Sequence, residues 1–270
     1  IDEEHEPSYK QEEKLKYHAR DSAIVLAKYH NIPIVLGSAT PSIESWLHAK
    51  QGKYQLHQMP HRVASRQMPE IQVIDMKNER SERENKEEIP FWLSENLHTQ
   101  MKETLEAGEQ VALFLNRRGV AQVVLCQDCG YTFECPNCAI SLTLHGKTHL
   151  VCHYCDYDQK LLESCPQCHE TDVKPLGLGT ELVERDMQKL FPEARMARAD
   201  RDEIQSRADL EDLIQGVEDR EVDILVGTQM IAKGLDFPGL TVVGLVMADV
   251  GFNIPDFRSS ERSFQLLTQV

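Results

Sequence analysis

All eight cysteines of this 270-residue chain lie in one stretch, and their spacing is the first sign of chemistry. They form four C-x2-C pairs: Cys126/Cys129, Cys135/Cys138, Cys152/Cys155 and Cys165/Cys168. A C-x2-C turn directs two thiolates to one point, and two such turns make the tetrahedral all-sulfur site that Zn²⁺ prefers. Four pairs therefore predict two zinc ions. A site closed by four thiolates has no open position for water, so we expect both ions to be structural.

The four pairs can be combined into two sites in three ways, and linker length favours one of them. The loop from Cys138 to Cys152 has the length found in zinc ribbons, whereas the segment from Cys129 to Cys135 is short for two turns that share one ion. We therefore favour a nested arrangement, with two inner and two outer pairs: Cys135/Cys138/Cys152/Cys155 and Cys126/Cys129/Cys165/Cys168. The other two pairings stay open at this stage.

A disulfide framework is the alternative use of eight cysteines, but it is typical of small secreted chains. Here the cysteines occupy one segment of a larger acidic chain with neither an N-terminal secretion signal nor an apolar run that could cross a membrane. We therefore expect a cytoplasmic protein with no membrane partner. Four histidines lie close by, and because eight thiolates are available we interpret them as surface residues: His145, His149, His153 and His169.

The formal net charge is -15, which limits how the chain could meet nucleic acid. Binding by general attraction needs clustered Lys and Arg against the phosphates, so any contact with nucleic acid must be local. The chain opens on a second group that could do chemistry, Asp2-Glu3-Glu4-His5. An isolated acidic tetrapeptide is usually a solvated turn, so its meaning depends on the elements around it.

The elements that follow this tetrapeptide read as helix, strand and helix. Apolar residues repeat at helical spacing from Ala19 to Asn31, and a short apolar run predicts a buried strand over 34–36. A GSATP loop follows, in which Thr40 can cap the next helix and Pro41 suits its first turn. We expect that helix to continue to about residue 51, before a glycine.

The rest of the chain alternates helices and strands around the cysteine segment. An edge strand and a solvated charged linker are predicted over 72–76 and 77–88. Helices are predicted over 94–106, from Thr180 to Pro192, over 210–217 and over 260–270. Buried strands are predicted over 110–115, 222–226 and 240–247, and an apolar run at 121–125 leads into the first cysteines. This order predicts an α/β fold with a parallel sheet, whose ligands would lie in the loops at 116–119 and 227–234.

With these loops in order, the chain resembles the superfamily 2 helicases, and most closely the bacterial primosomal replication-restart helicases of the DEEH type. The resemblance rests on the eight cysteines and on DEEH at 2–5, YKQEEKLKYHARD at 9–21, GSATPS at 37–42, FLNRRG at 114–119, GLGTE at 177–181, VGTQMIAKGLDFP at 226–238 and DFRSSER at 256–262. GSAT alone is a weak signal, whereas a double zinc insert between FLNRRG and GLGTE is highly specific. The resemblance covers nearly the whole chain.

The resemblance implies P-loop NTPase (RecA-like) helicase lobes interrupted by a two-zinc module. Residues 1–60 would be the C-terminal part of the first lobe and residues 61–90 a connector between lobes. An incomplete second lobe would take residues 91–125 and 173–270, and the zinc-binding insert residues 126–172. The substrate implied is ATP with Mg²⁺, in addition to the two structural Zn²⁺.

The acidic tetrapeptide is the catalytic set that the resemblance implies, through Asp2, Glu3 and His5. Asp2 would help to hold Mg²⁺, and Glu3 would orient or deprotonate the attacking water. Ser38 and Thr40 of the GSATPS stretch would couple hydrolysis to DNA contact.

Nucleotide and DNA contacts are implied for the remaining motifs. Gly234 and Asp236 would lie near the nucleotide. The residues implied to contact DNA come from the aromatic-rich stretch, the FLNRRG loop and the VGTQM loop: Tyr9, Lys10, Tyr17, His18, Arg20, Arg117, Arg118, Thr228 and Gln229. Stacking of bases on aromatic rings would let an acidic protein hold single strands. As alternatives, Tyr17 and His18 pack the next helix, and the two arginines of FLNRRG pair with carboxylates.

The resemblance also implies the activity of the full-length protein and of this piece of it. The glycine-rich phosphate loop should lie upstream of Ile1 and the paired arginines of the last helicase motif after Val270, so we expect this piece to hydrolyse no ATP alone. It implies a 3′ to 5′ DNA helicase that binds stalled or branched forks and restarts replication. We expect this helicase to be a monomer, and its expected partners are single-stranded DNA-binding protein and other primosome proteins. The alternatives are a zinc-ribbon nucleic-acid-binding module without ATPase activity, and another superfamily 2 translocase.

Overall fold

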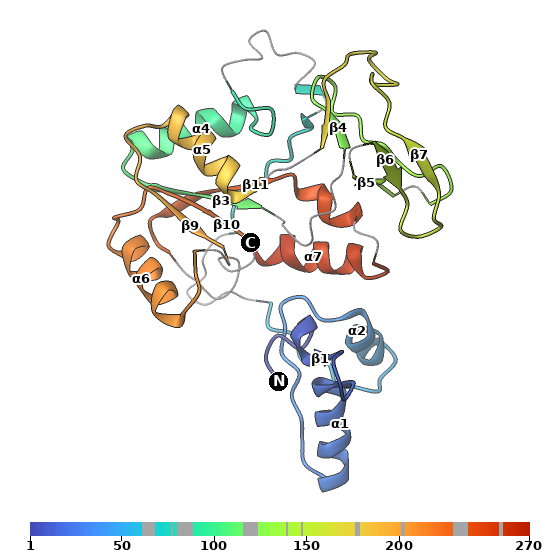
Figure 1. Cartoon of the computed structure of the whole chain (residues 1–270). Coiled ribbons are helices and arrows are strands. Elements are labelled where there is room, and N and C mark those ends of the chain that lie inside the picture. Colours follow the sequence, from blue (N-terminus) through green and yellow to red (C-terminus); the bar gives the residue numbers. More distant parts are fainter. Residues whose placement is uncertain are drawn as a thin grey trace. The chain divides into compact units, whose positions relative to one another are not determined.

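The computed structural model describes residues 1–60, 68–76, 78–79, 89–115, 124–138, 140–146, 148–175, 179–200, 203–228, 237–253 and 256–270. The chain divides into two compact units (Figure 1). Unit 1 is Ile1–Ile71 with Gln269, and unit 2 is Gln72–Thr268 with Val270. Within the described ranges, no helix is both long and apolar enough to span a membrane.

Unit 1 contains two helices and a short hairpin. α1 (Ala19–His30) ends at Asn31, whose left-handed conformation commonly closes a helix. α2 (Ile43–Lys50) ends before Gly52, which has a φ of +75°. The smaller elements are the 3-10 helix η1 (Pro7–Tyr9) and the antiparallel pair β1 (Lys10–Gln11) and β2 (Tyr17–His18). Both predicted helices of this part of the chain are confirmed.

The prediction that Thr40 caps α2 is wrong. Ser42, rather than Thr40, is the N-cap, and its hydroxyl accepts a hydrogen bond from the N–H of Ser45 at 3.3 Å. Both hydroxyls precede the helix in GSATPS, so the choice depends on which one the backbone turn places over the first free N–H groups.

The buried strand predicted over residues 34–36 is also wrong. This segment is extended but forms no strand, and the Val35 side chain is 77 % exposed. The amino group of Ile1 donates to the Val35 carbonyl at 2.8 Å, and the N–H of Gly37 donates to the Ile1 carbonyl at 2.8 Å. These two bonds are one rung of a parallel ladder, and an apolar segment with a single rung is not a strand.

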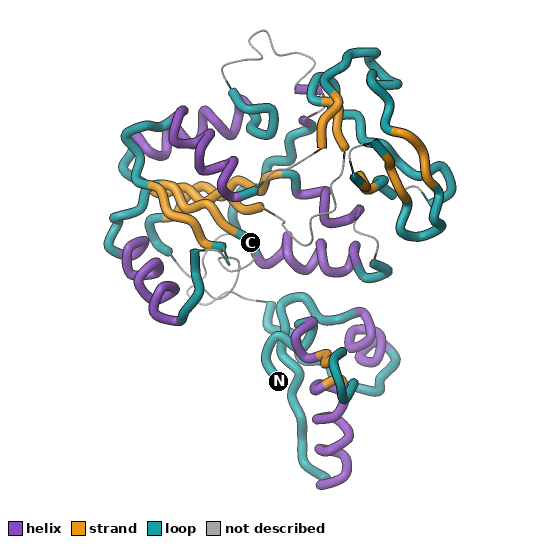
Figure 2. Tube along the Cα trace, viewed as in Figure 1, coloured by secondary structure: helices purple, strands orange, loops and turns teal. Residues whose placement is uncertain are grey.

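Unit 2 is built on a four-stranded parallel sheet, whose strands are the orange segments of the tube in Figure 2. In spatial order the strands are β11 (Leu240–Val246), β3 (Gln110–Leu115), β10 (Ile224–Gly227) and β9 (Met196–Ala199). The helices are α4 (Glu95–Glu106), α5 (Thr180–Leu190), α6 (Arg207–Glu218), α7 (Ser259–Gln269) and the 3-10 helix η3 (Ala248–Asn253). The α/β prediction with a parallel sheet is confirmed for this unit.

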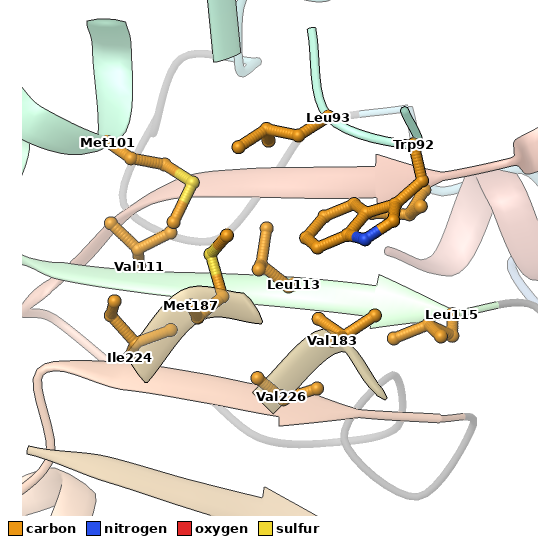
Figure 3. Packing of buried hydrophobic residues seen from close by; sticks show 11 residues of the cluster. Trp92, Leu93, Met101, Val111, Leu113, Leu115, Val183, Met187, Ile224 and Val226 are labelled. Carbon is orange, nitrogen blue, oxygen red and sulfur yellow. The ribbon is translucent and has the colours of Figure 1, made fainter. Parts of the chain in front are cut away.

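Alternation along β3 assigns the two faces of the sheet. Val111, Leu113 and Leu115 belong to the larger core, together with Met101 of α4 and Met187 of α5 (Figure 3). The smaller core on the other strand face contains Ala112, Ala199, Val217 and Leu225. β3 is therefore buried along its whole length, as apolar runs in parallel sheets usually are.

α4 lies so close to β11 that the strand needs a glycine. A Cβ at Gly244 would lie 2.7 Å from a Cδ of Leu97 and 2.8 Å from a Cδ of Leu113. Trp92, which precedes α4, is fixed in the same core by a hydrogen bond from its Nε1 to Asp186 at 3.0 Å. These contacts pack α4 and α5 on one face of the sheet.

Two strand predictions in unit 2 need correction. Residues 72–76 form no strand, and Val73 is 93 % exposed. β9 was not predicted, since Met196–Ala199 has a short and partly polar pattern. The signal that could have found it is topological: two successive helices over a parallel sheet need a strand between them.

The cysteine segment forms two small sheets of its own. β4 (Val124–Cys126) pairs antiparallel with β8 (Val173–Pro175), so the chain enters and leaves the insert on neighbouring strands. The second sheet holds β5 (Thr143–His145), β6 (His149–Val151) and β7 (Asp158–Lys160) in an antiparallel meander. A separate core around Phe133, Leu142 and Leu150 fills the insert.

Candidate metal centres and the acidic turn

The cysteine segment repeats one turn four times. In every pair, the N–H of the first cysteine donates to the carbonyl five residues later, as from Cys126 to Tyr131 at 2.9 Å and from Cys165 to Glu170 at 2.8 Å. In three pairs, the N–H four residues after the first cysteine returns to that cysteine's carbonyl from a residue with positive φ: Gly130 (+73°), Asp156 (+57°) and His169 (+65°). His169 is thus part of a turn.

The structure groups the sulfur atoms in the nested sets that we favoured. The Sγ atoms of Cys126, Cys129, Cys165 and Cys168 all lie within 4.8 Å of one another, and so do those of Cys135, Cys138, Cys152 and Cys155. All eight are free thiols, so the disulfide alternative is not realised. No histidine joins either set among the residues that the structure describes.

The sulfur separations fit a tetrahedral zinc site. The Sγ atoms of Cys126 and Cys168 are 3.6 Å apart, as are those of Cys135 and Cys155. A Zn–S bond of about 2.3 Å gives a tetrahedron with edges of about 3.8 Å. The N–H groups of Tyr154 and Gln167 donate to the Sγ atoms of Cys152 and Cys165, both at 3.4 Å, and these bonds stabilise thiolate charge. Two structural zinc ions fit the two sets.

The pKa values of the thiols explain why each set needs a cation. Hydrogen bonding, first from the backbone N–H of Tyr157, lowers the pKa of Cys155 to about 7. Burial opposes ionisation of Cys165, but the N–H groups of Cys168 and Gln167 outweigh it and its pKa also falls to about 7. By contrast, burial raises the pKa of Cys126 to about 12, and the hydrogen bond with Cys155 raises that of Cys138 to about 12. Four thiolates can therefore share a set only around a positive ion.

The two sets differ in exposure. The outer set has two buried and two half-buried cysteines, whereas the inner set includes the exposed Cys155. Near the inner set, His145 and His153 are exposed and their Nε2 atoms lie 3.1 Å apart. The expectation that the histidines lie at the surface agrees with this arrangement. The inner site is consequently the more accessible of the two.

The acidic turn and the GSATPS stretch bring together the five residues implied to act in catalysis and coupling. His5 Nδ1 lies 2.7 Å from the Ser38 hydroxyl and 3.4 Å from a carboxylate oxygen of Glu3. The same Ser38 hydroxyl accepts a hydrogen bond from the N–H of Thr40 at 2.9 Å. Asp2 lies beside them, and its side chain accepts from the N–H of Glu3 at 3.0 Å. The DEEH and GSATPS stretches are therefore in direct contact.

Glu4 is the residue of this turn that the sequence did not single out. Its side chain is buried, and its carboxylate accepts from the Ser42 N–H at 2.7 Å, the Ser42 and Ser45 hydroxyls at 3.1 and 2.9 Å, and the Arg20 guanidinium at 2.8 Å. Burial alone would raise the pKa of Glu4, but these donors outweigh it and the pKa is lowered. The spacing of its partners, 16 to 41 residues along the chain, gave no local signal.

The residues implied to contact DNA are placed unevenly. Tyr17 is 50 % exposed, Lys10 pairs with Glu12 at 3.0 Å, and the Tyr9 hydroxyl donates to the Asp2 carbonyl at 2.7 Å. His18 is half-buried and ends β2. Arg20 is only 8 % exposed and is bonded to Glu4, Ser42 and Asp21, so its guanidinium faces inward.

The other implied site residues follow β3 and β10 in the sequence. Thr228 follows β10, and its N–H donates to the Ala199 carbonyl at 3.2 Å. The remaining five lie outside the described residues: Arg117, Arg118, Gln229, Gly234 and Asp236.

The sequence of this chain is similar to those of known proteins. Residues 135–160 match the PriA DNA helicase Cys-rich region (CRR) domain. The whole chain is 47 % identical to a replication restart protein PriA of Bacillus subtilis over 33 % of that protein, and 43 % identical to one of Rickettsia felis over 41 % of it. For the Haemophilus influenzae protein of the same name, the values are 42 % and 36 %.

The chain thus spans between about a third and two fifths of the curated relatives that it matches. The match extends over 100 % of the chain, and the family model covers the segment that holds the four cysteines of the inner set. The resemblance to bacterial replication-restart proteins is therefore confirmed. By its sequence, the chain is similar along its whole length to part of these replication restart proteins PriA.

Proposed function

We propose that this chain is part of an ATP-dependent 3′ to 5′ DNA helicase that binds stalled or branched replication forks and restarts replication through primosome assembly. The observation that carries the proposal is the similarity to proteins named replication restart protein PriA along the whole chain, at 42 to 47 % identity. The contact between the acidic turn and the GSATPS loop supports it, since it joins the residues that such an enzyme would use.

The fold fits this role. The parallel sheet of unit 2, with helices against both faces, is the arrangement expected of a RecA-like lobe. In such sheets, ligands bind beyond the carboxyl ends of the strands. Thr228 follows the end of β10, and Gln229, Gly234 and Asp236 come after it in the sequence. We place the nucleotide near Gly234 and Asp236. The DNA backbone would lie near Thr228 and Gln229.

The acidic turn supplies the chemistry of hydrolysis in this proposal. Asp2 and Glu3 fit a magnesium nucleotide by their donor set, since Mg²⁺ takes carboxylate oxygens and phosphates together. Mg²⁺ bound there would neutralise charge on the transferring phosphoryl group. Glu3 orients the attacking water, and His5 connects this carboxylate to Ser38 through contacts of 3.4 and 2.7 Å. A movement of the GSATPS loop would therefore be transmitted to Glu3 through the imidazole of His5.

DNA contact in unit 1 falls to the exposed part of the aromatic-rich stretch. Tyr17 offers a half-exposed ring for stacking, and Lys10, which lies opposite His18 in the same hairpin, offers a cation. A stacked base contributes roughly 1–3 kcal/mol without sequence preference. Arg20 is left out of this set, because its guanidinium already serves Glu4 and Ser42. In the insert, a rigid two-zinc module would act as a platform for strand separation and for primosome proteins, including single-stranded DNA-binding protein.

The test uses the full-length protein that contains this chain. Its ATP hydrolysis is measured with and without forked DNA, alongside unwinding of forks with 3′ or 5′ single-stranded arms. Glu3→Gln should abolish turnover and spare ATP binding, while Glu103→Gln, an exposed change on α4, should leave turnover at the wild-type rate. DNA binding without ATP hydrolysis by the wild type would contradict the proposal and favour a zinc-ribbon binding module. The 270-residue chain alone should not turn over ATP.

A further inference from the structure

A strained backbone lies at the centre of the acidic turn. Glu3 has a φ of +44°, in the left-handed region that residues with a Cβ seldom adopt. Such conformations persist where the surroundings over-determine them, and they are common at functional sites. Two backbone hydrogen bonds hold Glu3 and the residue after it: the N–H of Glu4 donates to the Gly37 carbonyl at 3.0 Å, and the N–H of Glu6 donates to the Glu3 carbonyl at 2.9 Å.

The strongest tie belongs to the adjacent side chain. The Glu4 carboxylate is only 2 % exposed, and it connects three segments: the acidic turn, the first turn of α1 through Arg20, and the start of α2 through Ser42 and Ser45. No step of the proposed hydrolysis uses this carboxylate. A buried carboxylate with four donors, one of them an arginine, is a rigid anchor, because removing a partner leaves charge unpaired in a poorly solvated place.

We propose that Glu4 is a positioning residue, which with Arg20 holds Glu3 in its left-handed conformation and so fixes the catalytic carboxylate against His5 and Ser38. This inference rests on the proposed function. It adds that the four residues of the turn have separate roles: Asp2, Glu3 and His5 face the reaction, and Glu4 anchors the turn from behind.

The anchor requires a carboxylate rather than an amide. One oxygen, Oε1, accepts from the Ser42 N–H, and the other, Oε2, accepts from Arg20 and from both hydroxyls. A glutamine can place its oxygen at only one of these positions, and its NH₂ group would then face either the Ser42 N–H or the guanidinium, donor against donor. Glu4→Gln therefore keeps the size of the side chain and breaks the anchor.

The experiment compares Glu4→Gln with Asp21→Asn in the full-length protein. Asp21 also bonds Arg20, at 2.9 Å, but its side chain is 60 % exposed, so its loss should leave the anchor in place. For folded Glu4→Gln, we expect kcat for DNA-stimulated ATP hydrolysis to fall by about tenfold or more while KM for ATP changes little, since transition-state geometry is lost and binding is kept. Asp21→Asn should retain the wild-type kcat.

Ser45→Ala decides the question if Glu4→Gln does not fold. This change removes one part-buried donor to Oε2 and leaves the ion pair, so a smaller fall in kcat at unchanged KM is expected. Wild-type kcat in folded Glu4→Gln, or in Ser45→Ala when Glu4→Gln is unfolded, would overturn the inference, and so would a rise in KM without loss of kcat. A wild-type protein without ATPase activity would instead overturn the proposed function.

Discussion

The nested grouping of the cysteines makes a prediction that distinguishes all three pairings. In one variant, the four outer cysteines are replaced by serine: Cys126, Cys129, Cys165 and Cys168. In a second, the two N-terminal pairs are replaced instead: Cys126, Cys129, Cys135 and Cys138. The nested grouping leaves one complete site in the first variant and only two ligands per site in the second. The first should therefore retain one zinc per chain and the second none.

The size of the effect follows from the small core of the insert. A four-ligand zinc site contributes roughly 10–16 kcal/mol at pH 7. Burial of an apolar side chain contributes about 1.5–3 kcal/mol, or about 8–15 kcal/mol for the five buried apolar side chains of the insert core: Val124, Phe133, Leu142, Leu144 and Leu150. One ion is therefore worth about as much as the whole core, and a site left with two ligands should neither hold zinc nor stay folded.

Zinc content is measured on the purified variants by elemental analysis, and folding of the insert by hydrogen exchange at the β5, β6 and β7 amides. These amides should stay protected in the first variant and lose protection in the second. Pairing of neighbouring cysteine pairs in sequence would give the reverse zinc contents, none and one. The third pairing would give none in both. Either result would refute the nested grouping and the reasoning from sulfur distances.

Three further predictions follow from single contacts. With a chelator, the inner site, with exposed Cys155, should release zinc before the outer one, as followed in the four-serine variants of each set; equal rates would contradict this. Gly244→Ala should destabilise unit 2 by about 1–3 kcal/mol through overpacking, and an unchanged urea midpoint would exclude the close contact with Leu97. Because the folded pKa of Glu4 is lowered, its stabilisation is present above the unfolded pKa and lost as pH falls through the folded value. The difference in melting temperature between wild type and Glu4→Gln should therefore shrink on acidification.

Burial explains which strands could be predicted. Both ends of β3, Gln110 and Leu115, were predicted correctly. The strand is covered on both faces, so its sequence is an almost uninterrupted apolar run. β9 has only four residues, with the half-buried Arg198 among them, so its pattern does not stand out. The predicted strand at 34–36 was wrong for a different reason. An apolar composition shows that a segment favours burial, but it does not show whether a neighbouring strand exists to pair with it.

The candidate site divides in the same way. The nested cysteine sets could be predicted because ligand chemistry and loop length act locally, within one segment of the chain. Glu4 could not, because its partners Arg20, Ser42 and Ser45 come from two helix starts that only the fold brings to it. The family resemblance named Glu3 and His5, but it assigned Arg20 to DNA. A guanidinium that is charged in either role gives no sequence signal of which partner it has.

The connections of the insert explain how a parallel sheet accommodates it. The chain leaves after β3 and returns before α5, and β4 and β8 pair antiparallel at this point, with Cys126 opposite Val173. The outer zinc set, which joins cysteines from the two ends of the insert, ties the same two chain segments together. Because the β4–β8 pair and the outer zinc set close the insert on itself, β3 and β10 can pair directly in the sheet. The 108 residues between Leu115 and Ile224 include the insert, β9 and the helices before and after β9. The outer zinc set and the β4–β8 pair therefore confine the insert's effect on the sheet to one connection, and none of the described residues in the sheet core around Leu113 and Val226 belongs to the insert.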